Sequence, residues 1–128
     1  MSPVLSIQGA VKGAWLRELF PGSRIFVRHL DANGKYDNAY AGGVTKTTVT
    51  ADGVLWAQSE GWPTILRLTE SGDLRRFLLP CADPYLRVLR GPHDGVWFIS
   101  HDAGCSGSVE RDGIHVGNLP REEITSYL

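Results

Sequence analysis

A short motif of Asp-Gly, one or two apolar residues and Trp occurs twice, and its spacing constrains the fold more than any other feature of the chain. The motif stands in 50-TADGVLWAQS-59 and again in 91-GPHDGVWFIS-100. After each copy come a polar loop, a strand-like segment, a second glycine turn and a terminal Leu-Pro, in the same order. A repeat of roughly 40 residues indicates a chain built from similar supersecondary units.

A weaker copy of the unit precedes these two. There 12-KGAWL-16 takes the place of the motif, and the glycine turn lies in 31-DANGK-35. We therefore divide the chain into three repeats of four strands, about residues 4–42, 43–82 and 83–120, within one domain. The tail 121–128 follows Pro120, and its Glu122 and Glu123 predict the start of a short helix.

The composition supports strands over helices. The chain of 128 residues holds 15 glycines and 7 prolines, which leave short segments rich in β-branched and aromatic residues between them. We predict an all-β fold of three four-stranded antiparallel propeller-like blades. Since propellers close with about four to eight blades, we expect two chains to pair into a six-bladed ring. The alternative is a monomeric β-sandwich.

The repeated residues have structural roles in this interpretation. Glycine after Asp, Asn or Ser supplies the positive φ that tight hairpin turns need, as at Asp52-Gly53 and Asp94-Gly95. Trp15, Trp56 and Trp97 recur at matching positions, which favours packing between neighbouring sheets over ligand binding.

Charge and cysteine content limit the partners and the compartment. The formal net charge is −1, from 13 basic and 14 acidic residues, so the sequence predicts binding to neither nucleic acid nor an anionic membrane. The first residues lack the basic and apolar regions of a secretory signal, so we expect a cytoplasmic protein. For Cys81 and Cys105 we accordingly expect free thiols.

The polar loops predict where a ligand would bind. In a propeller, the loops between second and third strands share one rim with the links between blades. That rim would carry the candidate ligand-binding residues Glu60, Trp62, Tyr85, His101 and Asp102, together with Tyr40. Trp62 can stack on a sugar or flat ligand while Glu60 bonds its hydroxyls, or it can cover a sheet edge or subunit seam. We predict no catalytic residue, no metal and no cofactor.

The segment 84-PYLRVLRGPHDGVWFIS-100, followed by a strand, an Asp-Gly turn and Leu-Pro, resembles the blades of virginiamycin B lyase-like and NHL-type β-propellers. The resemblance covers residues 43–120 clearly and 4–42 faintly, and it implies the propeller architecture. In the lyases a His at the blade entry serves the reaction and acidic residues hold magnesium. This chain has Tyr85 at the matching place, and Gln58-Ser59 or Ser100-His101 where the acidic residue often stands.

Three functions follow in order of preference. The first is a non-catalytic binding module with a small-molecule or glycan site on one propeller face, because the sequence shows no catalytic triad, metal cluster or phosphate-binding loop. The second is a protein-interaction scaffold. The third is a lyase or hydrolase with a metal-assisted site, which would require Glu60, His101 and Asp102 to converge.

Overall fold

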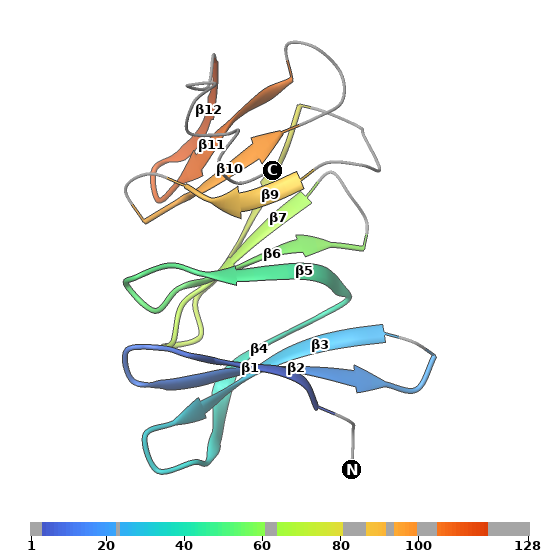
Figure 1. Ribbon diagram of the computed structural model, residues 1–128, viewed down its shortest axis with the longest axis vertical. Helices are drawn as coiled ribbons and strands as arrows, with labels where there is room; N and C mark the ends of the chain where they lie inside the picture. The colour runs from blue at the N-terminus through green and yellow to red at the C-terminus, as the bar shows by residue number, and fades with distance from the viewer. Residues whose placement is uncertain are drawn as a thin grey trace.

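The chain forms three separate antiparallel sheets (Figure 1). The computed structural model describes residues 4–22, 24–60, 64–80, 87–91, 94–99 and 105–117. Sheet 1 contains β1 (Val4–Gly9), β2 (Gly13–Phe20), β3 (Arg24–Asp31) and β4 (Tyr36–Gly42); sheet 2 contains β5 (Val44–Val49), β6 (Leu55–Ser59), β7 (Thr64–Leu68) and β8 (Leu74–Leu78); sheet 3 contains β9 (Arg87–Arg90), β10 (Val96–Ile99), β11 (Ser106–Glu110) and β12 (Gly113–Val116).

Each sheet is a meander in which every strand pairs with its neighbour along the chain. The prediction of three four-stranded units is therefore confirmed, and the β-sandwich alternative, which needs two sheets, is wrong. The β1–β2, β3–β4, β5–β6 and β7–β8 turns gather on one side, which we call the turn rim (left in Figure 1). The ends of β2, β4 and β6 and the starts of β3, β5 and β7 lie on the opposite side, which we call the loop rim.

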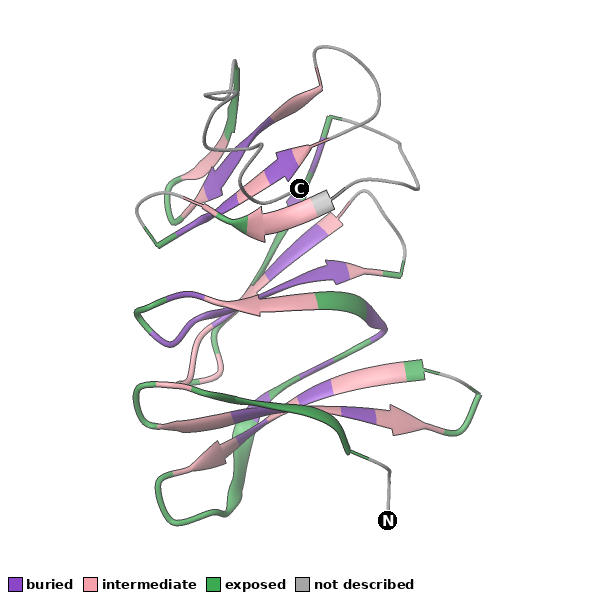
Figure 2. Ribbon diagram, viewed as in Figure 1, coloured by how far each residue is buried: buried purple, intermediate pink, exposed green. Residues whose placement is uncertain are grey.

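Sheet 2 lies between sheets 1 and 3 and has both faces covered (Figure 2). In its strand β6, side chains on both faces are therefore buried: Leu55, Trp56 and Ala57. Successive strand residues point to opposite faces. Leu55 and Ala57 accordingly pack in the core shared with sheet 1, and Trp56 packs in the core shared with sheet 3.

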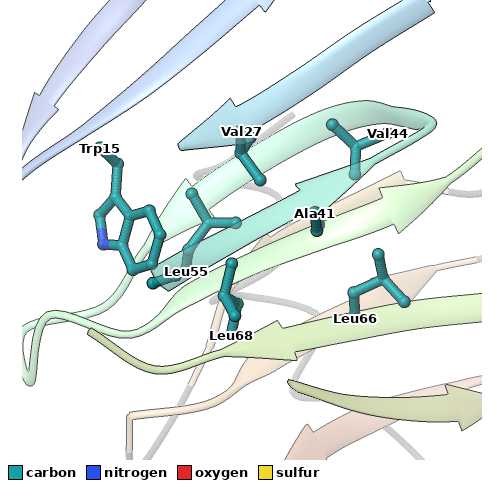
Figure 3. Packing of buried hydrophobic residues seen from close by; sticks show 9 residues of the cluster. Trp15, Val27, Ala41, Val44, Leu55, Leu66 and Leu68 are labelled. Carbon is teal, nitrogen blue, oxygen red and sulfur yellow. The ribbon is translucent and has the colours of Figure 1, made fainter. Parts of the chain in front are cut away.

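The core between sheets 1 and 2 is built around Trp15 (Figure 3). The ring of Trp15 is 2% exposed, and its Nε1 donates a hydrogen bond of 2.9 Å to the carbonyl oxygen of Gly53 in the β5–β6 turn. Val27 on sheet 1 and Leu68 on sheet 2 pack in the same core. Trp15 thus fastens sheet 1 to the next sheet through both packing and a hydrogen bond.

The core between sheets 2 and 3 is built around Trp56 and Phe98, both fully buried. The Trp56 Nε1 donates to the hydroxyl of Thr50 at 3.3 Å. The predicted packing role is confirmed for Trp15 and Trp56. Trp97 differs, because its neighbours Val96 and Phe98 point into this core and Trp97 points to the opposite, outward face of sheet 3.

The hairpin turns use left-handed backbone conformations as predicted, with one shift of position. Gly53 has a φ of 83° in the β5–β6 turn. In the equivalent β9–β10 turn, the non-glycine residue Asp94 has a φ of 59°. Asp tolerates this region better than most residues, because its side chain can bond the local backbone. We predicted a positive φ at Gly95 in this turn, and the structure has it at Asp94 instead.

Cys105 is disulfide-bonded, so the expectation of a free thiol is wrong for this residue. The chain's other cysteine, Cys81, lies outside the described residues, as does the predicted helix of the tail. The prediction of free thiols had rested on the N-terminal sequence, which carries no information on the partner of Cys105. In the described part of the chain, we find no helix with the length and apolar character needed to span a membrane.

Candidate functional site

The loop rim carries Glu60, a predicted ligand residue, at the junction of sheets 1 and 2. The Glu60 backbone N–H donates to the carbonyl oxygen of Gly43 at 2.8 Å, which fixes the start of the β6–β7 link. The Glu60 side chain is 43% exposed, and its Oε2 lies 4.0 Å from Nε of Arg24 on β3. The other predicted ligand residues, Trp62, Tyr85, His101 and Asp102, lie outside the described residues.

Beside this ion pair, three aromatic rings gather on the outward face of sheet 1, away from sheet 2. Phe26 and Tyr40 are parallel, with ring centroids 6.1 Å apart and an interplanar angle of 1°. Phe20 meets Phe26 edge-on at 4.6 Å, and the guanidinium of Arg24 lies 5.8 Å from the Phe26 ring. We placed Tyr40 in a rim loop, but it lies within β4, where it is 57% exposed.

These rings line a shallow, open pocket of about 510 Å³, which we call the aromatic pocket. It is larger than two other pockets that described residues line, which have volumes of about 360 and 400 Å³. Its lining residues come from β2, β3 and β4: Phe20, Phe26, Arg28, Asp37, Asn38 and Tyr40. The pocket therefore combines a flat aromatic wall with charged and amide groups, which is the usual composition of a small-molecule site.

Arg28 is held in the aromatic pocket by two neighbours. Its guanidinium carbon lies 3.6 Å from the centroid of the Tyr36 ring, and its Nη1 lies 3.9 Å from Oε2 of Glu18. The Tyr36 hydroxyl donates to Oε1 of Glu18 at 3.1 Å, and this hydrogen bond raises the pKa of Tyr36 above its usual value. Glu18 is buried, with 3% exposure, so the guanidinium is presented to the pocket with its counter-ion behind it.

Asp37 lines the other side of the pocket and is bound from behind by a buried histidine. Nδ1 of His29 donates to Asp37 Oδ2 at 2.5 Å, and the Ala39 N–H donates to Asp37 Oδ1 at 3.1 Å. Burial acts to raise the pKa of Asp37, but these hydrogen bonds outweigh it and leave the pKa below its usual value. Asp37 is therefore a stable carboxylate at neutral pH, available as a hydrogen-bond acceptor.

His29, on β3, is a buried histidine. It is 2% exposed and lies edge-on to Trp15 at 4.7 Å. Its Nε2 lies 3.5 Å from Oε2 of Glu70, which belongs to the β7–β8 turn of sheet 2, without the geometry of a hydrogen bond. His29 thus links the back of the aromatic pocket to the neighbouring sheet.

Two smaller pockets lie at the turn rim. One, of about 360 Å³, is lined by the cations Lys12, Arg67 and Arg111, the carboxylates Asp52, Glu70 and Asp73, and by Val11, Val54, Thr69 and Ser71. The other, of about 400 Å³, lies at the ends of β1, β5 and β9 and includes Arg90. Opposite charges balance in the first pocket, and burial lowers the pKa of Arg67. The balance gives that pocket no preference for an anion or a cation.

An exposed group of acidic residues and a histidine lies on sheet 3. Nε2 of His115 is 2.8 Å from Oδ1 of Asp112 and 3.4 Å from Oε2 of Glu110. Of the described residues, these are the ones close enough together to share a metal ion. Their solvent exposure is typical of ordinary surface ion pairs, and we assign them no ligand.

The sequence contained a signal for the aromatic pocket that we did not use. The strand registers place Phe26 and Tyr40 at the positions that Thr64 and Arg76 occupy in sheet 2. Aromatic residues in sheet 1 thus stand where sheet 2 has polar ones. Because the packing between sheets does not require aromatic residues at these two positions, their presence in sheet 1 indicates another role.

No protein-family model matches the chain. The virginiamycin B lyase of Nocardia farcinica is 31% identical over 102 residues, covering 79% of this chain and 36% of that protein. Among solved structures, a streptogramin B lyase matches with a TM-score of 0.59 and 21% identity, over 93% of this chain and 41% of that one. The three sheets are β-propeller blades that resemble those of virginiamycin B lyase.

A second solved structure extends the comparison with virginiamycin B lyase. A catalytically inactive variant from Staphylococcus aureus, solved with quinupristin, matches with a TM-score of 0.53 and 19% identity, over 94% of this chain and 46% of that one. The present chain therefore spans less than half the length of the virginiamycin B lyases it matches. At this identity the structural likeness establishes the shared fold, and it confirms the predicted propeller resemblance.

Proposed function

We propose that the chain is a non-catalytic binding module that takes a small molecule or glycan in the aromatic pocket. The observation that carries the proposal is the open, parallel pair of Phe26 and Tyr40 beside a positioned Arg28. Aromatic walls bind flat apolar faces, including the apolar face of a sugar ring, and a few polar groups set the orientation. Glu60, at the edge of this region, keeps its predicted role as an acceptor for ligand hydroxyls.

The polar groups of the pocket define the expected ligand. Arg28 offers guanidinium N–H donors, while Asp37 offers a carboxylate that stays ionised. Asn38 adds an amide that both donates and accepts. A ligand with one flat face and several hydroxyl groups satisfies all three residues, and a ligand carboxylate can in addition accept from Arg28.

Binding is favoured over acid–base catalysis by the state of Asp37. A general base is most effective when its pKa lies near the working pH. Hydrogen bonds from His29 and Ala39 move the pKa of Asp37 in the opposite direction, below its usual value. The Asp37 carboxylate is therefore suited to accept a hydrogen bond from a ligand hydroxyl, and it is a weak base for removing a proton.

Calorimetric titration with glucose, galactose, glucuronate and quinupristin tests the proposal. We expect at least one of these probes to bind, and Tyr40→Ala to weaken that binding about tenfold, the size of one lost aromatic contact. The matched control is Leu78→Ala, which removes an exposed apolar side chain from sheet 2, where 72% of Leu78 is accessible. Equal affinity of both variants would assign the binding to another part of the chain, and no binding of any probe would contradict the proposal.

A second candidate, breakdown of a streptogramin B compound, is favoured by the 31% identity to a virginiamycin B lyase. The test is chromatography of quinupristin after incubation with the chain, with and without magnesium. Time-dependent loss of the intact compound, proportional to protein concentration, would establish this activity in place of simple binding. Recovery of all quinupristin would leave the binding module as the function.

A further inference from the structure

The smaller of the two turn-rim pockets lies where turns of all three sheets meet, and we call it the charged pocket. Its volume is about 360 Å³. Sheet 1 contributes Val11 and Lys12 between β1 and β2, sheet 3 contributes Arg111 between β11 and β12, and sheet 2 contributes the remaining lining residues. Ligand sites often form between packed structural units, because each unit supplies different side chains. The charged pocket has this position in the molecule.

Among the described residues, none forms an ion pair within 4 Å with the three cations of the charged pocket, Lys12, Arg67 and Arg111. The guanidinium carbon of Arg67 lies 5.6 Å from the centroid of the Trp56 ring, and its Nε is buried without a hydrogen-bond partner. A buried donor in a protein nearly always has a partner. The Nε of Arg67 therefore requires an acceptor that the described residues do not supply.

Arg67 and Arg111 lie close enough for their charges to interact. Burial lowers the pKa of Arg67, the carboxylate of Asp52 acts in the opposite direction, and the charge of Arg111 adds to the lowering. One carboxylate can stabilise two guanidinium groups that repel each other, because its two oxygens accept N–H groups from both. The pair of arginines therefore favours a ligand with a carboxylate group.

The three carboxylates of the charged pocket are more fully hydrogen-bonded, yet two of them keep an oxygen for a ligand. Both oxygens of Glu70 accept backbone N–H groups from sheet 1, at 2.6 and 2.7 Å. Oδ1 of Asp52 accepts from the Thr50 hydroxyl at 2.5 Å. Oδ2 of Asp73 accepts from the Ser71 hydroxyl at 3.5 Å. From the described residues, Asp52 Oδ2 and Asp73 Oδ1 receive no hydrogen bond, so these oxygens can accept from a ligand ammonium group.

The formal charges of the pocket balance, with three cations and three carboxylates among its lining residues. A simple anion would be repelled by the carboxylates, and a simple cation would be repelled by the guanidinium groups. A ligand with one carboxylate and one ammonium group has favourable neighbours for both charges. The free α-amino acids are the simplest ligands of this kind, since a single carbon atom separates their two charged groups.

Two valines give the charged pocket an apolar side. Val54 is 6% exposed and Val11 is 65% exposed, and both line the pocket. An aliphatic group of the ligand can cover the open side of Val11, which removes apolar surface from water and favours binding. The pocket is therefore better suited to an amino acid with an aliphatic side chain than to one with a charged side chain.

We propose that the charged pocket binds a free α-amino acid with an aliphatic side chain. Arg67 and Arg111 hold its carboxylate, Asp52 accepts from its ammonium group, and Val11 contacts its side chain. The charged pocket and the aromatic pocket share no lining residue. Binding of an amino acid is therefore independent of the proposed function and adds a second site to it.

Calorimetric titration of the full chain with leucine, N-acetyl-leucine and leucine amide tests the proposal. The three probes share one side chain, but at a pH of about 6.5 they are a zwitterion, an anion and a cation. We expect leucine to bind at least about tenfold more tightly than either derivative, because each derivative lacks one of the two charged groups. Equal or tighter binding of a derivative would contradict the proposal, as would no binding of leucine at millimolar concentration.

Arg111→Gln is expected to weaken leucine binding about tenfold, since the amide keeps N–H donors but loses the positive charge. Arg111 is exposed in a turn, so the fold should tolerate the change. The matched control is Arg76→Gln, at an exposed arginine of sheet 2 that does not line the charged pocket. Thermal unfolding of both variants checks that neither has lost its fold. Equal affinity of the two variants for leucine would overturn the proposal.

Two further titrations keep the two binding proposals separate. Tyr40→Ala, a change in the aromatic pocket, should leave leucine binding unchanged, and Arg111→Gln should leave binding of the sugar probes unchanged. Loss of leucine binding in Tyr40→Ala would place leucine in the aromatic pocket and overturn the charged pocket as its site.

Discussion

The carboxylate of Glu70 in sheet 2 binds the backbone of Val11 in sheet 1: Glu70 Oε1 lies 2.6 Å from the Val11 amide nitrogen. Its other oxygen accepts a hydrogen bond of 2.7 Å from the Lys12 N–H. The Glu70 side chain is 10% exposed, so water does not replace these bonds readily when the carboxylate is changed. One side chain therefore connects the turns of two sheets that are far apart in sequence.

We expect Glu70→Gln to lower the free energy of unfolding by about 1.5–3 kcal/mol, the range for hydrogen bonds to a charged group. The amide keeps one acceptor oxygen, but its NH₂ group faces a backbone donor. Urea denaturation measures the change. Glu60→Gln is the control, because that carboxylate is 43% exposed in a long ion pair and should contribute less than about 1 kcal/mol. Similar losses for both variants would show that the connection to Val11 and Lys12 is not stabilising.

Gly13→Ala should destabilise sheet 1 severely, because a Cβ at Gly13 would lie 1.9 Å from the carbonyl oxygen of Leu30. The backbone of the paired strand β3 cannot move away from β2 without breaking the hydrogen bonds between the two strands. The matched substitution is Gly9→Ala on β1, where a Cβ meets no atom within 4 Å. We expect Gly13→Ala to cost more than about 2 kcal/mol and Gly9→Ala less than about 1 kcal/mol, measured by thermal and urea unfolding. Equal effects would contradict the close approach of β2 and β3.

The pKa of His115 should lie above its usual value of 6.5, mainly because of its hydrogen bond with Asp112, with the nearby Glu110 adding to the effect. The same hydrogen bond lowers the pKa of Asp112. The pair is then fully charged between the usual pKa values of an aspartate and a histidine. Its stabilising effect is lost in acid, as pH falls through the pKa of Asp112, and in base, as pH rises through that of His115.

NMR titration of the His115 ring measures this pKa directly. Asp112→Asn should bring it down toward 6.5, and Glu110→Gln should have a smaller effect because Asp112 is the larger cause of the shift. A His115 pKa at or below 6.5 in the unmodified chain would contradict the ion pair.

The disulfide of Cys105 predicts that a thiol-reactive dye, applied in denaturant without reductant, labels neither of the chain's two cysteines. Reduction should lower the free energy of unfolding by about 2–4 kcal/mol. Mass measurement without reductant, with Cys81→Ser as the companion variant, separates a bond within one chain from a bond between chains. Two reactive thiols would contradict the bond.

The architecture was predictable because its determinants recur along the sequence. The repeat of Asp-Gly and Trp located the turns of sheets 2 and 3, and Trp15 located sheet 1 despite its weaker pattern. β4 was less visible, because 36-YDNAYAG-42 has no β-branched residue and is held in place by its pairing with β3. For that reason Tyr40 was assigned to a loop.

The aromatic pocket was not predicted, because its residues come from three strands and meet only in the folded register. An irregularity between Arg28 and Leu30 in the pairing of β3 with β4 decides which β4 residue lies opposite Arg28. Such an irregularity depends on tertiary packing and has no local sequence signature here. Glu60 was named from the sequence because polar loops between strands are usual places for ligand contacts, and its ligand-binding role stays a prediction.

The double burial of β6 affects how the chain can be made. Residues Leu55, Ala57, Leu66 and Leu68 form the part of the first core that belongs to sheet 2. On the ribosome, the inward face of sheet 1, including Trp15, therefore has nothing to pack against until synthesis has passed Leu68. Sheet 1 alone therefore cannot complete its core. In a nascent chain, the inward side chains of sheet 1 become buried only after sheet 2 has emerged from the ribosome.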